Sequence, residues 1–389
     1  MQKYRTLKSI FHAGDDKTAR AELTRRREDY AAILTDFMVD QEPAFYMLIP
    51  QLVLLQQNIL HTEQSIGQHL DTMSLHSQDL YLTEVAMRSI IATDDIEGVR
   101  TTRTMIQQAI DSAKEQGKRL REFMHLSRGI SSRSIPQTLE DIRRDYDRMM
   151  AGELTAATSP DGEYFRSNPV HIMDGAQRPV HSGVHPESAI IERMSYLLEH
   201  ASREDTPVLA SAFAAHFMLE YTHPFYDGNG RYGRYLLAAH LSRVLSAPSV
   251  LMLSVIINEQ KKAYYKAFSD SEQPRNYGEL THFILMLSNM LLQAQERVLD
   301  DLVSAQDRSE KLLASLEPAL REHPKKETLI RALAEYSVYG TGEGMGLESL
   351  SELVQKNPRT VRTYLAELVQ AGTVQEHKKG KQLIWSLLL

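Results

Sequence analysis

Apolar residues recur every three or four positions along most of this 389-residue sequence, and this spacing predicts a mainly α-helical fold. Residues 30–60 and 280–316 show the pattern most clearly. We interpret residues 280–318 as one long connecting helix, whose apolar stripe also suits a homodimer. Residues 1–80 are expected to form an N-terminal helical region, with packing and partner binding both open as its role.

One segment, from about residue 164 to residue 184, interrupts the helical pattern. It is rich in Pro and Gly, Val170 and Ile172 alternate with polar neighbours, and Asp174-Gly175 offers a tight turn. We therefore predict a β-hairpin. Its place upstream of the motif described below favours a flap over a site, and an ordinary surface hairpin is the alternative.

Composition excludes several classes of function. The chain has no cysteine, so disulfides, thiolate metal sites and cysteine nucleophiles are ruled out. Its net charge of −7 argues against a surface that coats nucleic acid or anionic membranes. The N-terminus lacks the apolar run of a signal peptide, and the longest apolar stretches are too short to cross a bilayer. We expect a cytoplasmic protein with no membrane partner.

The most informative stretch is HPFYDGNGRYGR, residues 223–234, which lies between two helical segments. This pattern is typical of a loop that leads directly into a helix N-terminus. Small residues that tolerate left-handed dihedrals let successive backbone N–H groups converge on an anion, and the helix dipole adds positive potential there. The residues expected to form this anion hole are Gly228, Asn229 and Gly230.

The charged side chains of the stretch suit phosphate chemistry. Arg231 and Arg234 are three residues apart on one helix face, and both can bind phosphate oxygens with two donors. Asp227 is a lone carboxylate of the kind that holds Mg²⁺ beside phosphates. His223 has an imidazole that can accept a proton from an attacking hydroxyl. Together they predict nucleotidyl or phosphoryl transfer.

The pattern His-x-Phe-x-Asp-Gly-Asn-Gly-Arg-x-x-Arg matches every fixed position of the Fic-family signature. Its chance occurrence in such a chain is on the order of one in a hundred million. The chain resembles Fic proteins over roughly residues 81–287, which implies a Fic-type helical core. Most such enzymes move AMP from ATP onto a protein hydroxyl. The resemblance makes His223 the general base, Asp227 the Mg²⁺ ligand, Arg231 and Arg234 the phosphate clamps and Phe225 a core anchor.

The resemblance carries further expectations. The predicted hairpin is similar to the flap on which Fic enzymes lay the target segment, here a protein with a Ser, Thr or Tyr hydroxyl, or the enzyme itself. Tyr264 and Tyr265 resemble a tyrosine pair near the adenine pocket, although two tyrosines on an amphipathic helix are also typical of core. His216 and Glu220 are expected to support the site or the core. UMP or a phosphocholine donor remains an alternative cargo.

TDDIEG, residues 93–98, resembles the inhibitory motif of the family. The resemblance implies that Glu97 forms a salt bridge with Arg234 and so withholds that arginine from the nucleotide, within a helix at about residues 85–98. A further hypothesis is that Glu97 orients water, so that the same site removes AMP from the modified target. The alternative is a plain helix end marked by Gly98.

From residue 323 the pattern predicts helix, Gly-rich loop, helix, turn, helix and hairpin, which resembles a winged helix-turn-helix domain at residues 323–389. Pro358 suits the first turn of the third helix behind an Asn357 cap, and Gly372 suits its end. Basic residues on that helix and on the wing could meet DNA phosphates: Arg359, Arg362, Lys378, Lys379 and Lys381. Protein docking or dimerisation is the alternative role.

These features leave two functions open. The first is an autoinhibited protein adenylyltransferase that uses ATP and Mg²⁺. The second is a DNA-binding transcription regulator whose Fic core senses nucleotide. The intact His223 favours catalysis, because a sensor has no need of a base.

Overall fold

The computed structural model describes residues 4–111, 117–173, 179–340, 343–379 and 382–388. The chain divides into two compact units, which are described separately. The first comprises Met1–Glu63 and Ala86–Glu296, and the second comprises Gln64–Val85 and Arg297–Leu389. Within the described residues, no helix is both long and apolar enough to cross a membrane. The predicted mainly α fold is confirmed, since helices make up 67% of the structure.

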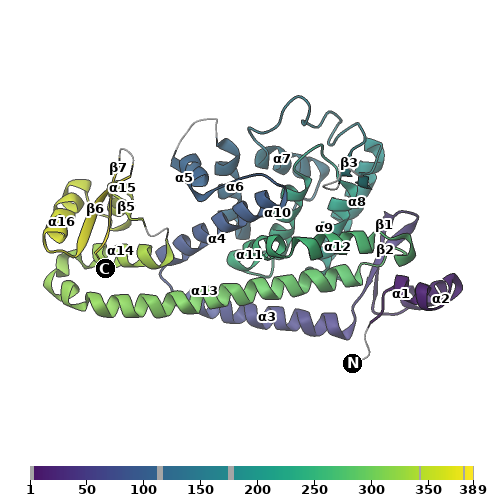
Figure 1. Ribbon diagram of the computed structural model, residues 1–389, viewed down its shortest axis with the longest axis horizontal. Helices are drawn as coiled ribbons and strands as arrows, with labels where there is room; N and C mark the ends of the chain where they lie inside the picture. The colour runs from purple at the N-terminus through teal and green to yellow at the C-terminus, as the bar shows by residue number, and fades with distance from the viewer. Residues whose placement is uncertain (1–3, 112–116, 174–178, 341–342, 380–381, 389) are drawn as a thin grey trace. The chain divides into compact units, whose positions relative to one another are not determined.

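The first unit is mostly helical (Figure 1). The helices on either side of the motif are largely buried. Ten of the described helices lie entirely within this unit: α1 (Leu7–Ala13), α2 (Asp16–Arg27), α5 (Arg103–Asp111), α6 (Lys118–Arg128), α7 (Leu139–Met149), α8 (Glu187–Ser202), α9 (Val208–Thr222), α10 (Asn229–Leu241), α11 (Ala247–Glu259) and α12 (Lys261–Ser271). Short 3-10 turns occur at Ile130–Ser132 and Pro274–Asn276.

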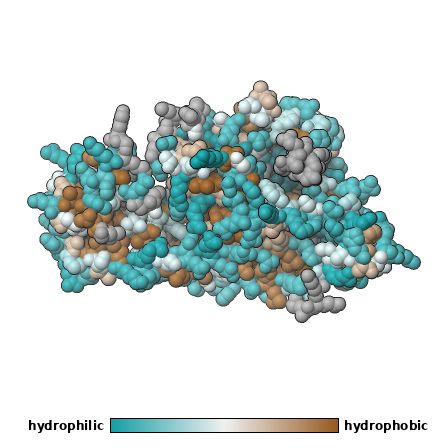
Figure 2. Space-filling view, viewed as in Figure 1, coloured by the Kyte–Doolittle hydropathy of each residue, from teal (hydrophilic) through white to brown (hydrophobic). Residues whose placement is uncertain are grey.

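Three helices contribute residues to both units: α3 (Pro50–Asp71), α4 (Leu75–Ile96) and α13 (Thr281–Glu322). The last of these is the long helix predicted at residues 280–318, and it continues four residues further. Figure 2 shows brown apolar residues along α3, and Val53, Leu54 and Leu60 of this helix are exposed. The homodimer suggested by the apolar stripe of α13 stays a prediction.

The helical prediction for residues 30–60 is wrong in its first half. Strand β1 (Ala32–Val39) pairs antiparallel with β2 (Glu42–Met47), and α3 begins only at Pro50. A helix across this segment would have to tolerate Pro43 in its interior. The hairpin is held instead by a distant segment: Phe45 donates its N–H to the carbonyl of Gly278 at 3.1 Å and accepts from Leu280 N–H at 2.8 Å. The apolar spacing alone does not reveal that partner.

The segment predicted as a flap contains two short antiparallel strands, β3 (His171–Met173) and β4 (Pro179–Ser182). The predicted Asp174-Gly175 turn lies outside the described residues. Two backbone hydrogen bonds follow β4: Gly183 N–H donates to Val170 O at 3.1 Å, and Val184 N–H donates to Thr222 O at 3.0 Å. The second bond fixes the flap to the C-terminal end of α9, directly before the motif.

The second unit contains α14 (Glu327–Tyr339), α15 (Leu347–Leu353) and α16 (Pro358–Gln370) beside a three-stranded sheet. The strand order is β5 (Met345–Gly346), β7 (Gln382–Leu387) and β6 (Val374–Lys379). A 3-10 turn at Pro324–Lys326 precedes α14. The core of this unit holds Leu333, Leu350, Leu365 and Trp385.

Local signals in the tail act as predicted. The Asn357 side chain accepts a hydrogen bond from the N–H of Arg359 at 2.8 Å, and Pro358 begins α16. Gly372 follows the end of this helix with φ +73°. The helices and the terminal hairpin occur in the predicted order, while β5 lies where a loop was expected. The assignment to the winged helix-turn-helix class stays a prediction.

Candidate active site

The motif forms a tight loop between two buried helices. Helix α9 ends at Thr222, His223 takes a left-handed conformation (φ 52°), and α10 begins at Asn229. Gly228, directly before α10, has φ +74°, and an added Cβ there would lie 2.7 Å from Met150 Sδ. A helix's first N–H groups have no partner inside the helix, so the start of α10 presents donors to an anion.

Aromatic stacking holds the loop in place. Phe225 is fully buried and stacks on Tyr146, with ring centroids 3.6 Å apart and planes 7° from parallel. The Tyr146 hydroxyl donates to the carbonyl of Asp227 at 2.9 Å. Phe225 is therefore the core anchor that the motif predicted, and Tyr146 on α7 is a supporting residue that sequence reasoning missed.

Asn229 supports the loop through its side chain as well as its backbone. Its Oδ1 accepts from Phe225 N–H at 2.9 Å, and its Nδ2 donates to Phe225 O at 2.8 Å. Because the side chain is buried, this pair of bonds closes the loop onto the first turn of α10. The sequence had assigned this residue only a backbone amide.

His223 is partly buried at the entrance of the loop. Burial, followed by the charges of His181 and Arg166, lowers the pKa of the His223 imidazole to about 4. The ring is therefore neutral at pH 7, and its Nδ1 has no hydrogen-bond partner among the described residues. A neutral imidazole is the protonation state that a general base requires.

Arg166 is a functional residue that sequence reasoning missed. It is fully buried, donates from Nε to the carbonyl of His223 at 2.9 Å, and donates from Nη2 to the carbonyl of Val184 at 2.8 Å. It thereby joins the motif to the residues that follow the flap. An arginine within the flap segment was the available signal, but only the fold shows which carbonyls it meets.

Glu97 binds Arg234, as the inhibitory motif implied. Its Oε1 lies 2.7 Å from Arg234 Nη2, and an added Cβ on Gly230 would lie 2.2 Å from that same oxygen. The carboxylate therefore lies against the first turn of α10. Burial alone would lower the pKa of Arg234, but the charge of Glu97, together with smaller contributions from Tyr264, Glu220 and the hydrogen bond to Glu97, outweighs burial and raises that pKa.

Thr93 completes this contact. Its Oγ1 accepts from Arg234 Nε at 2.5 Å, and its backbone carbonyl accepts from Nη2 at 3.1 Å. Gly98 follows with φ +74°, so the interpretation of this segment as a helix end is also correct. The helix-end interpretation is compatible with the predicted contact between Glu97 and Arg234, because the end of α4 positions Glu97.

Arg231 has different partners from Arg234. Its side chain is 3% exposed, and Nη1 lies 2.6 Å from Glu153 Oε2. Asp227, half-exposed, lies 3.5 Å from Nη2 and accepts a hydrogen bond from its neighbour Gly228 N–H at 2.6 Å. Glu153 follows α7 and was not identified from the sequence.

The two tyrosines of the pair differ in their exposure to solvent. Tyr264 is 2% exposed and its hydroxyl lies 2.7 Å from His216 Nε2, while Tyr265 is 47% exposed and donates to the carbonyl of Ile96 at 3.3 Å. Tyr264 thus has a core partner, and Tyr265 contacts the end of α4. Their nucleotide-binding role stays a prediction. His216 also lies 3.2 Å from the carbonyl of Gly233 on α10, a supporting position.

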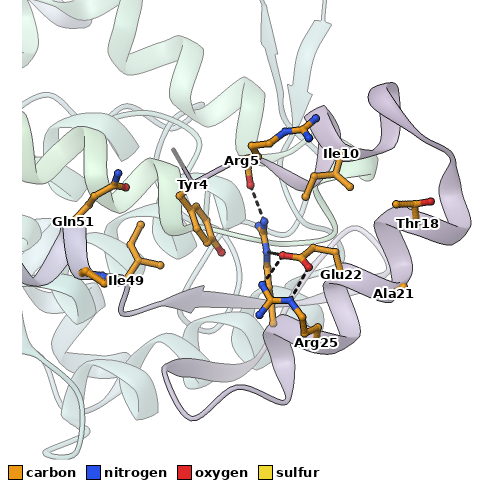
Figure 3. Close-up of a pocket in the computed structure, with 11 residues that line it drawn as sticks. Tyr4, Arg5, Ile10, Thr18, Ala21, Glu22, Arg25, Ile49 and Gln51 are labelled. Atoms are coloured by element: carbon orange, nitrogen blue, oxygen red, sulfur yellow. Dashed lines mark hydrogen bonds and ion pairs between the residues drawn. The ribbon is translucent and has the colours of Figure 1, made fainter. Parts of the chain in front are cut away.

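One cavity of the first unit lies away from the motif. It measures about 640 Å³ and is bounded by α1, α2 and the start of α3 (Figure 3). Its charged side chains are neutralised within the protein: Glu22 lies 2.7 Å from Arg25 and 2.9 Å from Arg26. Since no motif residue lines this cavity, the site is assigned to the loop and α10.

The fold and the loop define a helical domain in which a partly buried histidine precedes the N-terminus of a buried helix. Residues 136–241 match the model of the Fic/DOC family. Domains of this family are known for transferring nucleotides or other phosphate-containing groups to proteins. The match includes the whole motif and ends at the last residue of α10.

The chain is similar to several solved structures, and one of them, with a TM-score above 0.5, supports the fold. A Fic family protein from Desulfovibrio desulfuricans is 19% identical, with a TM-score of 0.53 over 88% of this chain and 97% of its own. A Fic domain containing signaling protein from Bacteroides thetaiotaomicron is 15% identical, with a TM-score of 0.46 over 63% of this chain and 95% of its own. Fic-1 from C. elegans is 15% identical, with a TM-score of 0.47 over 76% and 80%.

Proposed function

We propose that this protein is an adenylyltransferase that moves AMP from ATP to a Ser, Thr or Tyr hydroxyl of a target protein or of itself. The observation that supports this most directly is the neutral, partly buried His223 beside a helix N-terminus that carries two buried arginines. A base, an anion hole and phosphate clamps are the groups that such a transfer needs.

In this reaction the target hydroxyl oxygen attacks the α-phosphorus, and its proton goes to His223. The bond from the α-phosphorus to the bridging oxygen breaks, and pyrophosphate leaves. The amides of Gly228, Asn229 and Gly230 hold phosphate oxygens, while Arg231 and Arg234 neutralise the charge that develops on the leaving group. The flap strand β3 would receive the target segment as an added strand.

Asp227 is the residue that would hold Mg²⁺. Its carboxylate is half-exposed at the loop, and the described residues contain no cluster of three acidic or imidazole ligands. A single carboxylate fits Mg²⁺, which takes its other ligands from phosphate oxygens and water. When bound, the ion would neutralise charge on the phosphates.

The brake in this proposal is the contact of Glu97 with Arg234. The carboxylate occupies one face of the arginine and the space over Gly230, so a phosphate and Glu97 compete for the same positive potential. A competing contact of about 2–3 kcal/mol would suppress the productive state about tenfold to a hundredfold.

Transfer of label from α-labelled ATP tests the proposal. Glu97→Gly is expected to raise self-labelling about tenfold to a hundredfold over wild type, because Arg234 is released. The double variant Glu97→Gly with His223→Ala is the matched control and should lose the signal. Equal labelling of wild type and Glu97→Gly would show that Glu97 does not inhibit the enzyme. Labelling that survives His223→Ala would show that His223 is not the general base.

The same site is proposed to remove AMP from a modified target, with Glu97 orienting the attacking water. Pre-labelled protein incubated with fresh wild type should lose label faster than with Glu97→Gly. Equal rates of loss would contradict this reverse reaction.

The alternative function is a DNA-binding regulator that senses nucleotide. Arg359 and Arg362 are exposed on α16, and Lys378 is exposed on β6. Lys381 and the side chain of Lys379 lie outside the described residues. A gel shift of random duplex DNA that weakens with salt, and weakens further in Arg359→Ala, would support it. Label transfer from ATP that depends on His223 would favour the adenylyltransferase over the nucleotide-sensing regulator.

A further inference from the structure

The two motif arginines are held in different ways. Arg234 donates from both Nε and Nη2 to residues at the end of α4, so two of its three nitrogens are occupied there. Arg231 donates from Nη1 to Glu153, while its Nε is buried without a partner among the described residues. Arg231 is thus held at Nη1 by Glu153 and, over a longer contact of 3.5 Å, at Nη2 by Asp227, while its Nε keeps a donor without a partner among the described residues.

Glu153 links Arg231 to a second buried arginine. Its other oxygen, Oε1, forms an ion pair with Nε of Arg119 on α6. Arg119 in turn pairs with Asp94 through two bonds, Nη1 to Oδ1 at 2.9 Å and Nη2 to Oδ2 at 2.7 Å. Charges alternate along this series, so each buried arginine faces a carboxylate on either side.

The series ends on the helix that carries the brake. Asp94 is fully buried on α4, follows Thr93 directly and precedes Glu97 by three residues. It also accepts a hydrogen bond from Thr101 Oγ1 at 2.5 Å. Burial opposes the charge of Arg119, but the hydrogen bond and charge of Asp94, with a further contribution from Glu153, outweigh it and raise the pKa of the guanidinium. The network is therefore charged and rigid at neutral pH.

We propose that Glu153 is a positioning residue for Arg231, held in place through Arg119 by Asp94 on the brake helix. This inference rests on the proposed function, in which Arg231 binds the phosphates. Helix α4 then acts in two opposite ways: Glu97 withholds Arg234, and Asp94 supports the orientation of Arg231. Release of the brake needs only the departure of Glu97, with the rest of α4 remaining in place.

Calorimetric binding with Glu97→Gly as the parent tests this inference. Glu153→Gln in that background removes the charge and keeps the shape, so Arg231 loses its anchor. We expect the dissociation constants of ATP and of inorganic tripolyphosphate to rise about tenfold. The dissociation constant of AMP, which lacks the outer phosphates, should change less than about twofold. A structural defect would weaken all three probes together.

The matched control is Glu122→Gln. Glu122 on α6 forms an ion pair with Arg148 on α7 at 3.1 Å. It resembles the Glu153 contact, because Arg119 is also on α6 and Glu153 follows α7. Neither partner contacts a motif arginine. In the Glu97→Gly background this variant should bind all three probes as the parent does.

Asp94→Asn distinguishes support from inhibition. If α4 acts on Arg231 as a support, Asp94→Asn in the Glu97→Gly background weakens binding of ATP and tripolyphosphate. If the whole helix end acts as a brake, the same change tightens binding and overturns the proposal. Thermal melting accompanies each measurement, and Glu153→Gln, whose side chain is partly exposed, provides the test if Asp94→Asn does not fold.

The proposal and the proposed function fail separately. Parent protein that binds tripolyphosphate but transfers no label from ATP overturns the adenylyltransferase, while the variants still test Glu153. Unchanged tripolyphosphate binding in Glu153→Gln overturns the role of Glu153 whatever the transfer activity. Parent protein that binds no tripolyphosphate overturns Arg231 as a clamp, and the positioning role with it.

Discussion

At the scale of single residues, Glu97 and Glu220 lie near the same arginine in different states. Glu97 binds Arg234 at 2.7 Å, whereas Glu220 Oε1 is buried without a hydrogen-bond partner among the described residues. Burial, partly offset by the charge of Arg234, raises the pKa of the Glu220 carboxyl to about 8. Glu220 is therefore mostly protonated at pH 7, so Glu97 is the carboxylate that balances the positive charge of Arg234.

Glu220 predicts a pH-dependent stability. In the unfolded chain its carboxyl ionises near the ordinary glutamate pKa of 4.5, but in the folded protein it stays protonated up to about pH 8. The folded state binds more protons between these values, so the free energy of unfolding falls as pH rises through this window. Glu220→Gln removes the effect, and its melting temperature relative to wild type should rise by several degrees from pH 5 to pH 8.

Thermal melts at both pH values check this. Glu192→Gln, a change of the same type at an exposed position on α8, should show no pH-dependent difference from wild type. A constant difference between Glu220→Gln and wild type across the window would contradict a buried, protonated Glu220.

At the scale of elements, the site depends on two helix termini that meet. The end of α4 brings Thr93 and Glu97 to Arg234, and the start of α10 presents Gly230 beneath the Glu97 carboxylate. Gly228 allows the chain to turn abruptly into α10. Its φ of +74° is a conformation that residues with a Cβ rarely adopt.

Gly228→Ala is expected to disturb this start of α10. The left-handed conformation costs about 1–2 kcal/mol for a residue with a Cβ, and the new methyl group would press on Met150. Urea unfolding should show that loss, and label transfer by Glu97→Gly should fall as well. Gly67→Ala on α3 is the control: it has no neighbour within 4 Å, so it should preserve or raise stability by up to about 1 kcal/mol.

At the scale of the whole molecule, the chain has two cores that can be followed separately. Its single tryptophan, Trp385, is 3% exposed in the core of the second unit, so its emission reports that unit. The motif, the flap and the end of α4 all belong to the first unit.

Leu365→Ala tests this division. Leu365 is fully buried in the second core, and truncation of such a side chain costs about 2–5 kcal/mol. The urea midpoint of Trp385 emission should fall, while label transfer by Glu97→Gly, assayed without urea, should stay within about twofold of its parent. The exposed Leu383→Ala is the control. Loss of transfer together with an unchanged emission midpoint would contradict the assignment of Leu365 to the second core.

Much of this arrangement is local in the sequence and could be predicted from it. Helical periodicity, the loop-to-helix motif, the buried Phe225, the Asn357 cap and the pairing of Glu97 with Arg234 all followed from residue spacing or from a resemblance based on it. Such features depend on neighbours in the chain or on a motif that specifies its own geometry.

Only the tertiary structure decided the contacts between distant segments. The β1–β2 hairpin forms because Gly278 and Leu280 supply its backbone partners, and Arg166 meets carbonyls that a linear reading cannot place. Glu153 and Arg119 look like ordinary surface charges until the fold buries Arg119 beside Asp94 and brings the partly exposed Glu153 between Arg119 and Arg231. Burial and charge pairing are properties of the packed chain, so spacing along the sequence could not reveal them.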